Sequence, residues 1–294
     1  FEQQAARQEQ RKDEDYDEVV EESLLDEDDQ DVYILSKISD IMHGLFGAYK
    51  DGALPIFEQL IQHFVKLLAI ENPWPDHQWA LCIFDDLIEH AGPMALQYQQ
   101  YFLQPLLHYI CDKQGEVRQA ACYGVGVMAK HGGEGFSQAC AEAMPQLLKV
   151  IQDPESRKVE NLAPTENAIA AVTKICKYLP TAINVDEVLP HWLTWLPVWD
   201  DEEESVHVYT YLCDLVEANN PQILGENNQN LPIIMRIIAE AFNKQAVDSN
   251  ISVRMANIVR QVQGNNELFQ ACLAVLNEEQ QGALSTALQE TPTS

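Results

Sequence analysis

The chain of 294 residues carries 46 acidic and 18 basic side chains, which gives a formal net charge of −28 and a sequence pI near 4.4. Such a charge argues against direct binding of nucleic acid, because the phosphate backbone would be repelled and no stripe of Lys or Arg offsets the repulsion. The field would instead attract a basic protein, although the same charge could simply keep the chain soluble. The first residue is Phe1 rather than Met, so we expect a piece of a longer protein.

The seven cysteines are spaced singly along the chain, without a C-x-x-C pair. Most lie within apolar helical patterns, so we interpret them as small buried side chains in a reducing compartment. The densest apolar run, Trp192 to Trp199, is far shorter than the roughly 20 residues that cross a bilayer. We therefore expect a soluble intracellular protein that has no membrane contact.

Residues 1–31 hold 14 acidic and three basic side chains and contribute −11 of the net charge. The carboxylates are concentrated in Asp13 to Asp15 and in Asp26 to Asp31. Charge of this density usually indicates a mobile, solvated segment. Apolar residues within 19–25 also allow a weak helix followed by an acidic turn. We treat residues 1–31 as an acidic N-terminal segment that could include the first helix of a repeat.

The stretch from Leu103 to Gly132 has the pattern of one helical hairpin. Apolar residues recur at i, i+3, i+4 and i+7 in both of its halves, and a turn of about four residues separates them. Each helix has one face to bury, but two short helices form too small a core. The hairpin must therefore be stacked between neighbours of its own kind.

Both helices of this hairpin recur along the chain. The first is a proline followed by two or three apolar residues, and its copies lie at Pro55, Pro105, Pro145, Pro190 and Pro232. These spacings of 40 to 50 residues are close to the roughly 40 to 47 residues of HEAT and armadillo repeats. A proline is compatible with these helices where it begins or kinks them.

The second helix recurs six times, and each copy ends at a small or helix-breaking residue. No stretch alternates in hydrophobicity for long enough to indicate a strand. We therefore predict an all-α fold, a HEAT-repeat superhelical solenoid that stacks about five to six helical hairpins in a right-handed sense over residues 32–266. Residues 267–294 should form capping helices and a short tail. Capping boxes are predicted at Asp201–Glu204 and Asn277–Gln280.

Seven stretches, which cover nearly the whole chain in order, resemble the C-terminal part of nuclear import receptors of the importin beta family. They are DEDYDEVVEESLLDEDDQDVYIL (Asp13 to Leu35), PWPDHQWALCIFDDLIEH (Pro73 to His90), EVRQAACYGVGVMAKHGG (Glu116 to Gly133), TENAIAAVTKI (Thr165 to Ile175), EVLPHWLTWLP (Glu187 to Pro197), YLCDLVEANNPQILGENNQNLP (Tyr211 to Pro232) and ANIVRQVQ (Ala256 to Gln263).

The resemblance implies a receptor that binds basic cargo, such as ribosomal proteins and histones, and shuttles between cytoplasm and nucleus. It implies contact with Phe-Gly nucleoporins in the pore and release of cargo by Ran-GTP, whose main site in this family lies in N-terminal repeats outside this sequence. The family holds cargo on a concave surface lined by the second helices of the repeats. We expect a monomer that is not an enzyme. The alternative is a static HEAT-repeat scaffold of a multiprotein complex.

Three groups of residues are candidates for the cargo surface. A stripe on the second helices offers aromatic and acidic side chains to Lys and Arg; an acidic run follows three tryptophans; and a carboxylate cluster lies on one helix. Each also has a structural explanation, since Trp79 could pack on a neighbouring repeat, Asp200 to Glu204 favours a helix dipole, and the cluster could be a solvated face. The candidate residues are Trp79, Asp85, Asp86, Glu89, Asn167, Asp200, Asp201, Glu202, Glu203, Glu204, Tyr211 and Asp214.

Two other motifs do not indicate a ligand site. Gly124 to Ala129 matches the dinucleotide fingerprint G-x-G-x-x-A, but it lies in the middle of a predicted helix, where small residues allow close packing. His108, Cys111 and Asp112 could share a helical face, but no second pair of ligands follows at a suitable spacing. We therefore expect no nucleotide cofactor, no metal and no catalytic residues.

Overall fold

The structure is a computed structural model that describes residues 2–12 and 18–291, and within these residues all regular secondary structure is helical. Four short 3-10 helices lie between the others: η1 (Lys50–Ala53), η2 (Gly92–Tyr98), η3 (Glu134–Phe136) and η4 (Glu226–Asn228). The α-helices are α1 (Glu2–Gln10), α2 (Glu18–Tyr49), α3 (Leu54–Leu67), α4 (Trp74–Ala91), α5 (Gln99–Tyr109), α6 (Gly115–His131), α7 (Ser137–Ile151), α8 (Val159–Tyr178), α9 (Val185–Trp195), α10 (Glu202–Glu217), α11 (Pro221–Leu224), α12 (Leu231–Asn243), α13 (Ser249–Gln263), α14 (Asn266–Leu273) and α15 (Glu278–Glu290).

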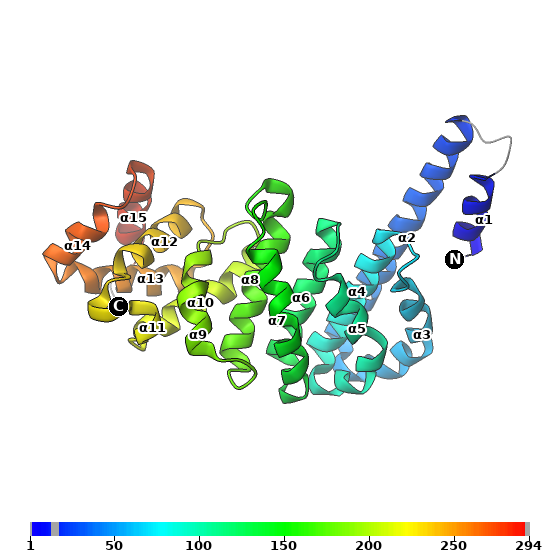
Figure 1. Cartoon of the computed structure of the whole chain (residues 1–294), viewed down its shortest axis with the longest axis horizontal. Coiled ribbons are helices and arrows are strands. Elements are labelled where there is room, and N and C mark those ends of the chain that lie inside the picture. The colour runs from blue at the N-terminus through cyan, green and yellow to red at the C-terminus, as the bar shows by residue number, and fades with distance from the viewer. Residues whose placement is uncertain (1, 13–17, 292–294) are drawn as a thin grey trace.

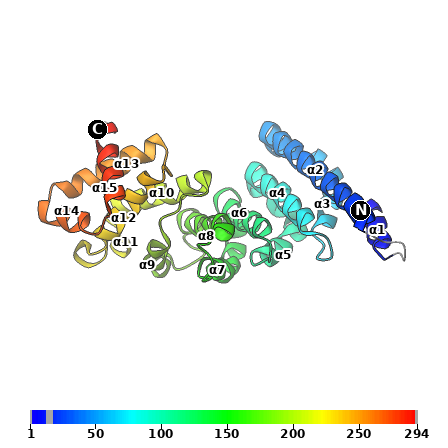
Figure 2. The same ribbon diagram turned by 90° about the horizontal axis from the view of Figure 1, so that it is seen from above.

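The helices form two layers along an elongated, curved array (Figure 1). An inner layer of α2, α4, α6, α8, α10 and α13 lies on the concave side, and each of these helices packs on the next. Helices α3, α5, α7, α9 and α12 form the outer layer (Figure 2). The predicted all-α solenoid of stacked helical pairs is confirmed. The prolines lie as predicted, at the start of α3 and α12 and inside α5, α7 and α9.

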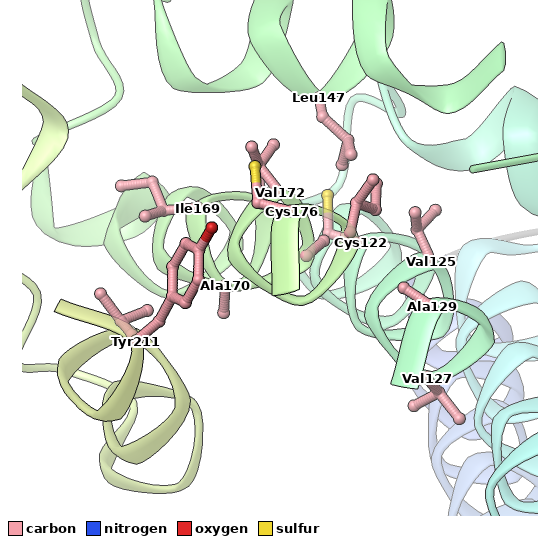
Figure 3. Close-up of a cluster of buried hydrophobic side chains, with 14 of the residues drawn as sticks. Cys122, Val125, Val127, Ala129, Leu147, Ile169, Ala170, Val172, Cys176 and Tyr211 are labelled. Atoms are coloured by element: carbon pink, nitrogen blue, oxygen red, sulfur yellow. The ribbon is translucent and has the colours of Figure 1, made fainter. Parts of the chain in front are cut away.

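The core runs without interruption through the stack. At its N-terminal end a chain of five phenyl rings links neighbouring repeats, with successive centroids 5.3 to 6.3 Å apart: Phe46, Phe57, Phe84, Phe102 and Phe136. In the middle of the array, α8 is buried between α6, α7 and α10 (Figure 3). Every residue from Pro164 to Cys176 is buried, because this helix has neighbours on nearly all sides.

The acidic N-terminal region differs from the prediction. Asp26 to Asp31, expected as a turn, lies inside the 32-residue helix α2, so the boundary after residue 31 falls within a helix. The carboxylates are tolerated there because Arg7 and Arg11 of α1 pair with them: Arg7 bonds Asp28 and Asp31, and Arg11 bonds Asp28. The cluster Asp13 to Asp15 lies outside the described residues.

Of the two predicted capping boxes, one is complete. Asn277 and Gln280 exchange both bonds at the start of α15. At the start of α10 the Asp201 side chain accepts the Glu204 backbone N–H, but the Glu204 side chain bonds Lys174 instead of returning to the cap. The box at Asp201–Glu204 is therefore only half formed, since a buried ammonium is the stronger partner for this carboxylate.

Gly124 and Gly126 lie in the middle of α6, as predicted, and allow α6 to approach the helices on both sides. A Cβ atom on Gly124 would overlap Asp85 of α4 and lie 2.7 Å from Leu106 Cδ1. A Cβ atom on Gly126 would lie 3.1 Å from Lys174 Cδ of α8. The nucleotide interpretation is excluded by this position, since a phosphate-binding loop must precede its helix.

A buried ion pair joins α8 to α10. Lys174 Nζ lies 2.7 and 2.8 Å from the two carboxylate oxygens of Glu204, and both side chains are at most 4% exposed. The same ammonium lies 5.2 Å from the ring centroid of Tyr123 on α6. One cation of α8 therefore contacts both neighbouring inner helices, α6 and α10.

We expect Gly124→Ala to destabilise the chain by about 1–3 kcal/mol, because the new methyl group forces Asp85 and Leu106 out of place. The matched control is Gly44→Ala in α2, where nothing lies within 4 Å of the added Cβ; its gain in helix propensity should stabilise by about 0.5–1 kcal/mol. Urea unfolding measures both variants. Equal midpoints for the two would contradict the close approach of α4 and α6.

Lys174→Met should lower the free energy of unfolding by about 3–5 kcal/mol, because Glu204 would be left buried and unpaired. The double variant Lys174→Met/Glu204→Leu should recover most of this loss. Lys177→Met is the control, since its pair with Asp214 is partly exposed and should contribute at most about 1 kcal/mol. A double variant no more stable than Lys174→Met would show that the pair is not the cause.

Candidate functional site

A groove of about 420 Å³ crosses the inner layer from α2 to the N-terminus of α10. Four inner helices supply most of its walls, and the turn before α10 closes one end. The lining residues are Ser39, Asp40, His43, Gln78, Cys82, Asp85, Asp86, Glu89, Glu116, Gln119, Ala120, Tyr123, Asn167, Asp201 and Glu203.

The groove is strongly acidic. Seven of its lining residues are Asp or Glu, and none of the described residues that line it is Lys or Arg. The carboxylates come from α2, α4, α6 and the start of α10, so stacking the repeats brings together charges far apart in the chain. Asp40, Glu116 and Glu203 are exposed and accessible from solvent. This surface therefore favours a cationic ligand.

Helix α4 supplies three of the carboxylates, at positions i, i+1 and i+4. Asp86 accepts a hydrogen bond of 2.7 Å from His43 Nδ1, and this bond raises the pKa of His43. Glu89 accepts a bond of 3.2 Å from the Tyr123 hydroxyl. Burial raises the pKa of Asp86, against the lowering effect of His43. Two of the three groups are thus held in place by a neighbouring helix.

Asp85 is the exception, because neither of its carboxylate oxygens has a hydrogen-bond partner among the described residues. Its exposed fraction is 2%. Burial raises the pKa of Asp85 well above its ordinary range, and the negative charges of Asp86 and Glu89 add to the shift. The carboxyl group is consequently held in its neutral form over a wide pH range.

The far end of the groove is fixed by Glu166 of α8. This buried carboxylate accepts hydrogen bonds of 2.7 to 3.2 Å from the backbone N–H groups of Trp199, Asp200 and Asp201. Asp201 then accepts a bond of 2.8 Å from the Asn167 side chain and caps α10. The acidic turn is therefore anchored to α8 through both its backbone and its side chain.

The structure brings half of the candidate cargo residues into this groove. The six are Asp85, Asp86, Glu89, Asn167, Asp201 and Glu203. Asp200 in the adjoining turn and Glu202 at the start of α10 are exposed but do not line the groove. Trp79 is half-buried outside the groove, and its indole Nε1 is buried without a partner among the described residues.

Three other candidates are engaged within the fold, which corrects their expected exposure. Glu204 is buried in the ion pair with Lys174. Tyr211 is 8% exposed and packs edge-on against Trp192. Asp214 is held by Lys177 and Arg254 at 2.7 and 2.8 Å, and these bonds lower its pKa. Their spacing on α10 indicated one face correctly, but not which neighbouring helix covers that face.

Sequence reasoning missed three lining residues of the groove, two on α2 and one on α6. Asp40 and His43 lie one turn apart on α2, and Glu116 opens α6. Alignment of the second helices at their C-terminal ends included α2 as a repeat, so Asp40 and His43 could have been found by extending the stripe to this helix. Glu116 is harder to find from the stripe, because it lies in the first turn of its helix.

Asp85→Asn should stabilise the chain at neutral and alkaline pH. Because the folded pKa of Asp85 is raised above its ordinary value of 3.8, the unfolded chain loses this proton first, and stability falls as pH rises from that value toward the folded pKa. The isosteric amide does not titrate. The free energy of unfolding of Asp85→Asn should exceed that of the parent chain only slightly at about pH 4 and by about 1–3 kcal/mol at about pH 8.

Urea unfolding across this pH range measures the difference between Asp85→Asn and the parent chain. The control is Asp51→Asn, because Asp51 is exposed. Its free energy of unfolding should differ from that of the parent chain by the same amount at each pH. A difference at Asp85 that does not change with pH would refute a buried neutral carboxyl group.

The sequence of this chain is similar to known protein families, and its fold is similar to solved structures. Residues 1–70 match the family model "Importin repeat 6", and residues 96–163 match the model "HEAT-like repeat". Importin subunit beta-3 of Saccharomyces cerevisiae is 26% identical over 215 residues, or 69% of this chain and 19% of its own length. A probable importin-5 homolog of Dictyostelium discoideum is 26% identical over 80% of this chain and 22% of its own length.

Solved structures of the karyopherin Kap121p share the fold. The complex with the SUMO protease Ulp1p superposes with a TM-score of 0.73 at 20% identity, over 96% of this chain and 25% of that one. The complex with RanGTP has a TM-score of 0.75 at 18% identity, over 90% of this chain and 24% of that one.

None of the helices in the described part of the chain has both the length and the apolarity to span a bilayer. The chain itself spans about a fifth of the length of the curated relatives it matches. Their names and the repeat model confirm its resemblance to the importin beta family of nuclear transport receptors, and within that family to the importin-5 type, also called karyopherin beta 3.

Proposed function

We propose that this chain is the part of a nuclear import receptor that holds a basic segment of cargo in the acidic groove of its inner layer. The observation that carries the proposal is the lining itself, with seven carboxyl groups and no Lys or Arg among the described residues. Ribosomal proteins and histones are the expected class of cargo, because their exposed tails are rich in Lys and Arg.

The geometry suits an extended basic peptide. Asp40 and Glu203 stand on opposite sides of the groove, on α2 and α10, with Glu116 of α6 between them along the stack. Side chains spaced along a peptide could each meet one carboxylate, while Gln119 offers polar contacts to the peptide backbone. The contact is non-covalent and driven by charge, so binding should weaken as salt screens it.

We further propose that the complete receptor carries out an import cycle. Its cargo would be bound in the cytoplasm, carried through the pore by contacts with Phe-Gly nucleoporins, and released in the nucleus by Ran-GTP. Support comes from Kap121p, whose solved complexes include RanGTP and Nup53p. Exposed apolar side chains on the outer helices, such as Ile56 and Leu60 of α3, are suitable contacts for Phe-Gly segments.

The competing function is a static scaffold. A complete receptor mixed with a basic histone tail distinguishes the two, because Ran-GTP should displace the tail from a receptor and leave it bound to a scaffold. This experiment tests the cycle, whereas binding of a peptide to the present chain tests the groove alone.

Removing three accessible charges should weaken binding of a fluorescent Lys-rich peptide. For Asp40→Asn/Glu116→Gln/Glu203→Gln we expect roughly a tenfold increase in Kd in low salt, since exposed pairs contribute up to about 1 kcal/mol each. Fluorescence anisotropy at about 0.05 M and 0.3 M salt should show the difference shrink as screening increases.

The matched control carries the same loss of charge on the outer side of the array. Glu134→Gln/Glu142→Gln/Glu187→Gln alters three exposed residues at η3, α7 and α9, and we expect its Kd to change less than twofold. Equal weakening by the two triple variants would show that only net charge matters, and absence of binding in low salt would overturn the groove as the cargo site.

A further inference from the structure

Two histidines and a carboxylate converge where α2 packs on α4. One ring nitrogen of His43, one of His90 and one carboxylate oxygen of Asp86 all lie within 4.8 Å of one another. His43 comes from α2, and Asp86 and His90 lie one turn apart on α4. Two imidazoles and one carboxylate are a typical set of ligands for Zn²⁺.

Polar atoms in this cluster are incompletely satisfied by the protein. His90 Nε2 is buried and has no hydrogen-bond partner among the described residues. A buried polar atom without a partner indicates an unfilled interaction at this position.

A positive charge already lies beside the cluster. Lys50 Nζ is 3.2 Å from His90 Nδ1, and Lys50 itself is exposed. Asp86 Oδ1 is 2.7 Å from His43 Nδ1, and Glu89 adds a further carboxylate on the same helix. The position thus attracts cations, and the flexible ammonium of Lys50 is a competitor that a divalent ion would displace.

Access and geometry both allow a metal ion to enter. The His43 side chain is 67% exposed, whereas that of Asp86 is 12% exposed. With metal bonds of about 2.0–2.2 Å, ligand atoms in a tetrahedral site lie roughly 3.3–3.6 Å apart. Separations of up to 4.8 Å exceed this spacing, so the ligand side chains would have to turn toward a bound ion, and the exposed His43 imidazole has room to do so.

We propose that His43, Asp86 and His90 form a Zn²⁺ site that joins α2 to α4, with the fourth coordination position open to water. The site would fix the angle between the first two inner helices of the array. His43 and Asp86 also line the acidic groove, so a bound ion would add positive charge to the proposed cargo surface. Metal titration without peptide tests this site separately from the proposed function.

The test is titration of the metal-free chain with Zn²⁺ by calorimetry, and with Co²⁺ by absorption spectroscopy. The parent chain should bind one ion with the spectrum of nitrogen and oxygen ligands. His43→Ala and His90→Gln should each weaken binding by more than about 100-fold, because loss of a direct ligand exceeds the 10–100-fold effect of a supporting residue. Lys50→Gln should tighten binding, since it removes the competing charge.

His108→Ala and His191→Ala provide matched controls, because both residues are exposed and lie outside the cluster. They should leave the affinity unchanged. Circular dichroism shows whether His90→Gln is folded, and the exposed His43 gives a second variant that does not disturb the core. Binding that survives both His43→Ala and His90→Gln, or a cobalt–thiolate charge-transfer band from the nearby Cys82, would overturn the proposed site.

Discussion

The buried ammonium of Lys174 is the interaction on which the centre of the array depends. It is removed from water, so it must be compensated by protein groups, and the two neighbouring inner helices supply them: the carboxylate of Glu204 on α10 and the ring of Tyr123 on α6. Gly126 of α6 leaves the space that the Lys174 side chain fills. Because Glu204 lies in the first turn of α10, the pair also holds the start of that helix against α8. This pair therefore adds to the Glu166 contacts that fix the far end of the acidic groove.

The groove gathers seven carboxyl groups within a small volume, which would be costly if all were ionised. The structure reduces this cost in different ways. Asp86 is paired with His43, Asp201 caps α10 and accepts a bond from Asn167, and Asp85 is buried deeply enough to keep its proton. Only the residues at the rim, such as Glu116 and Glu203, face water without such compensation. The compensated carboxyl groups thus limit the cost to stability, and the carboxyl groups at the rim of the same surface attract the ligand.

Much of the architecture could be predicted from the sequence, because a solenoid repeats one local pattern. The apolar periodicity and the prolines located the helical pairs, and the glycines of α6 were correctly identified as sites of close packing. The prediction of an acidic turn at Asp26 to Asp31 was wrong. A helix is possible there because Arg7 and Arg11 of α1, a different element, pair with its carboxylates. Tyr211 and Glu204 show the same limit: periodicity identifies a face, but only the packing of the next repeat decides whether that face is covered.

Glu166 has a consequence for the kind of ligand that the groove can accept. The N-terminus of a helix normally offers free amides that attract phosphate and other anions. Here Glu166 already occupies the three amides before α10, and Asp201 occupies the next turn. A phosphate group attached to a basic segment would meet four amides that already have carboxylate partners, and the acidic side chains beside them would repel it. Phosphorylation of a ligand close to its contact residues would therefore work against its recognition.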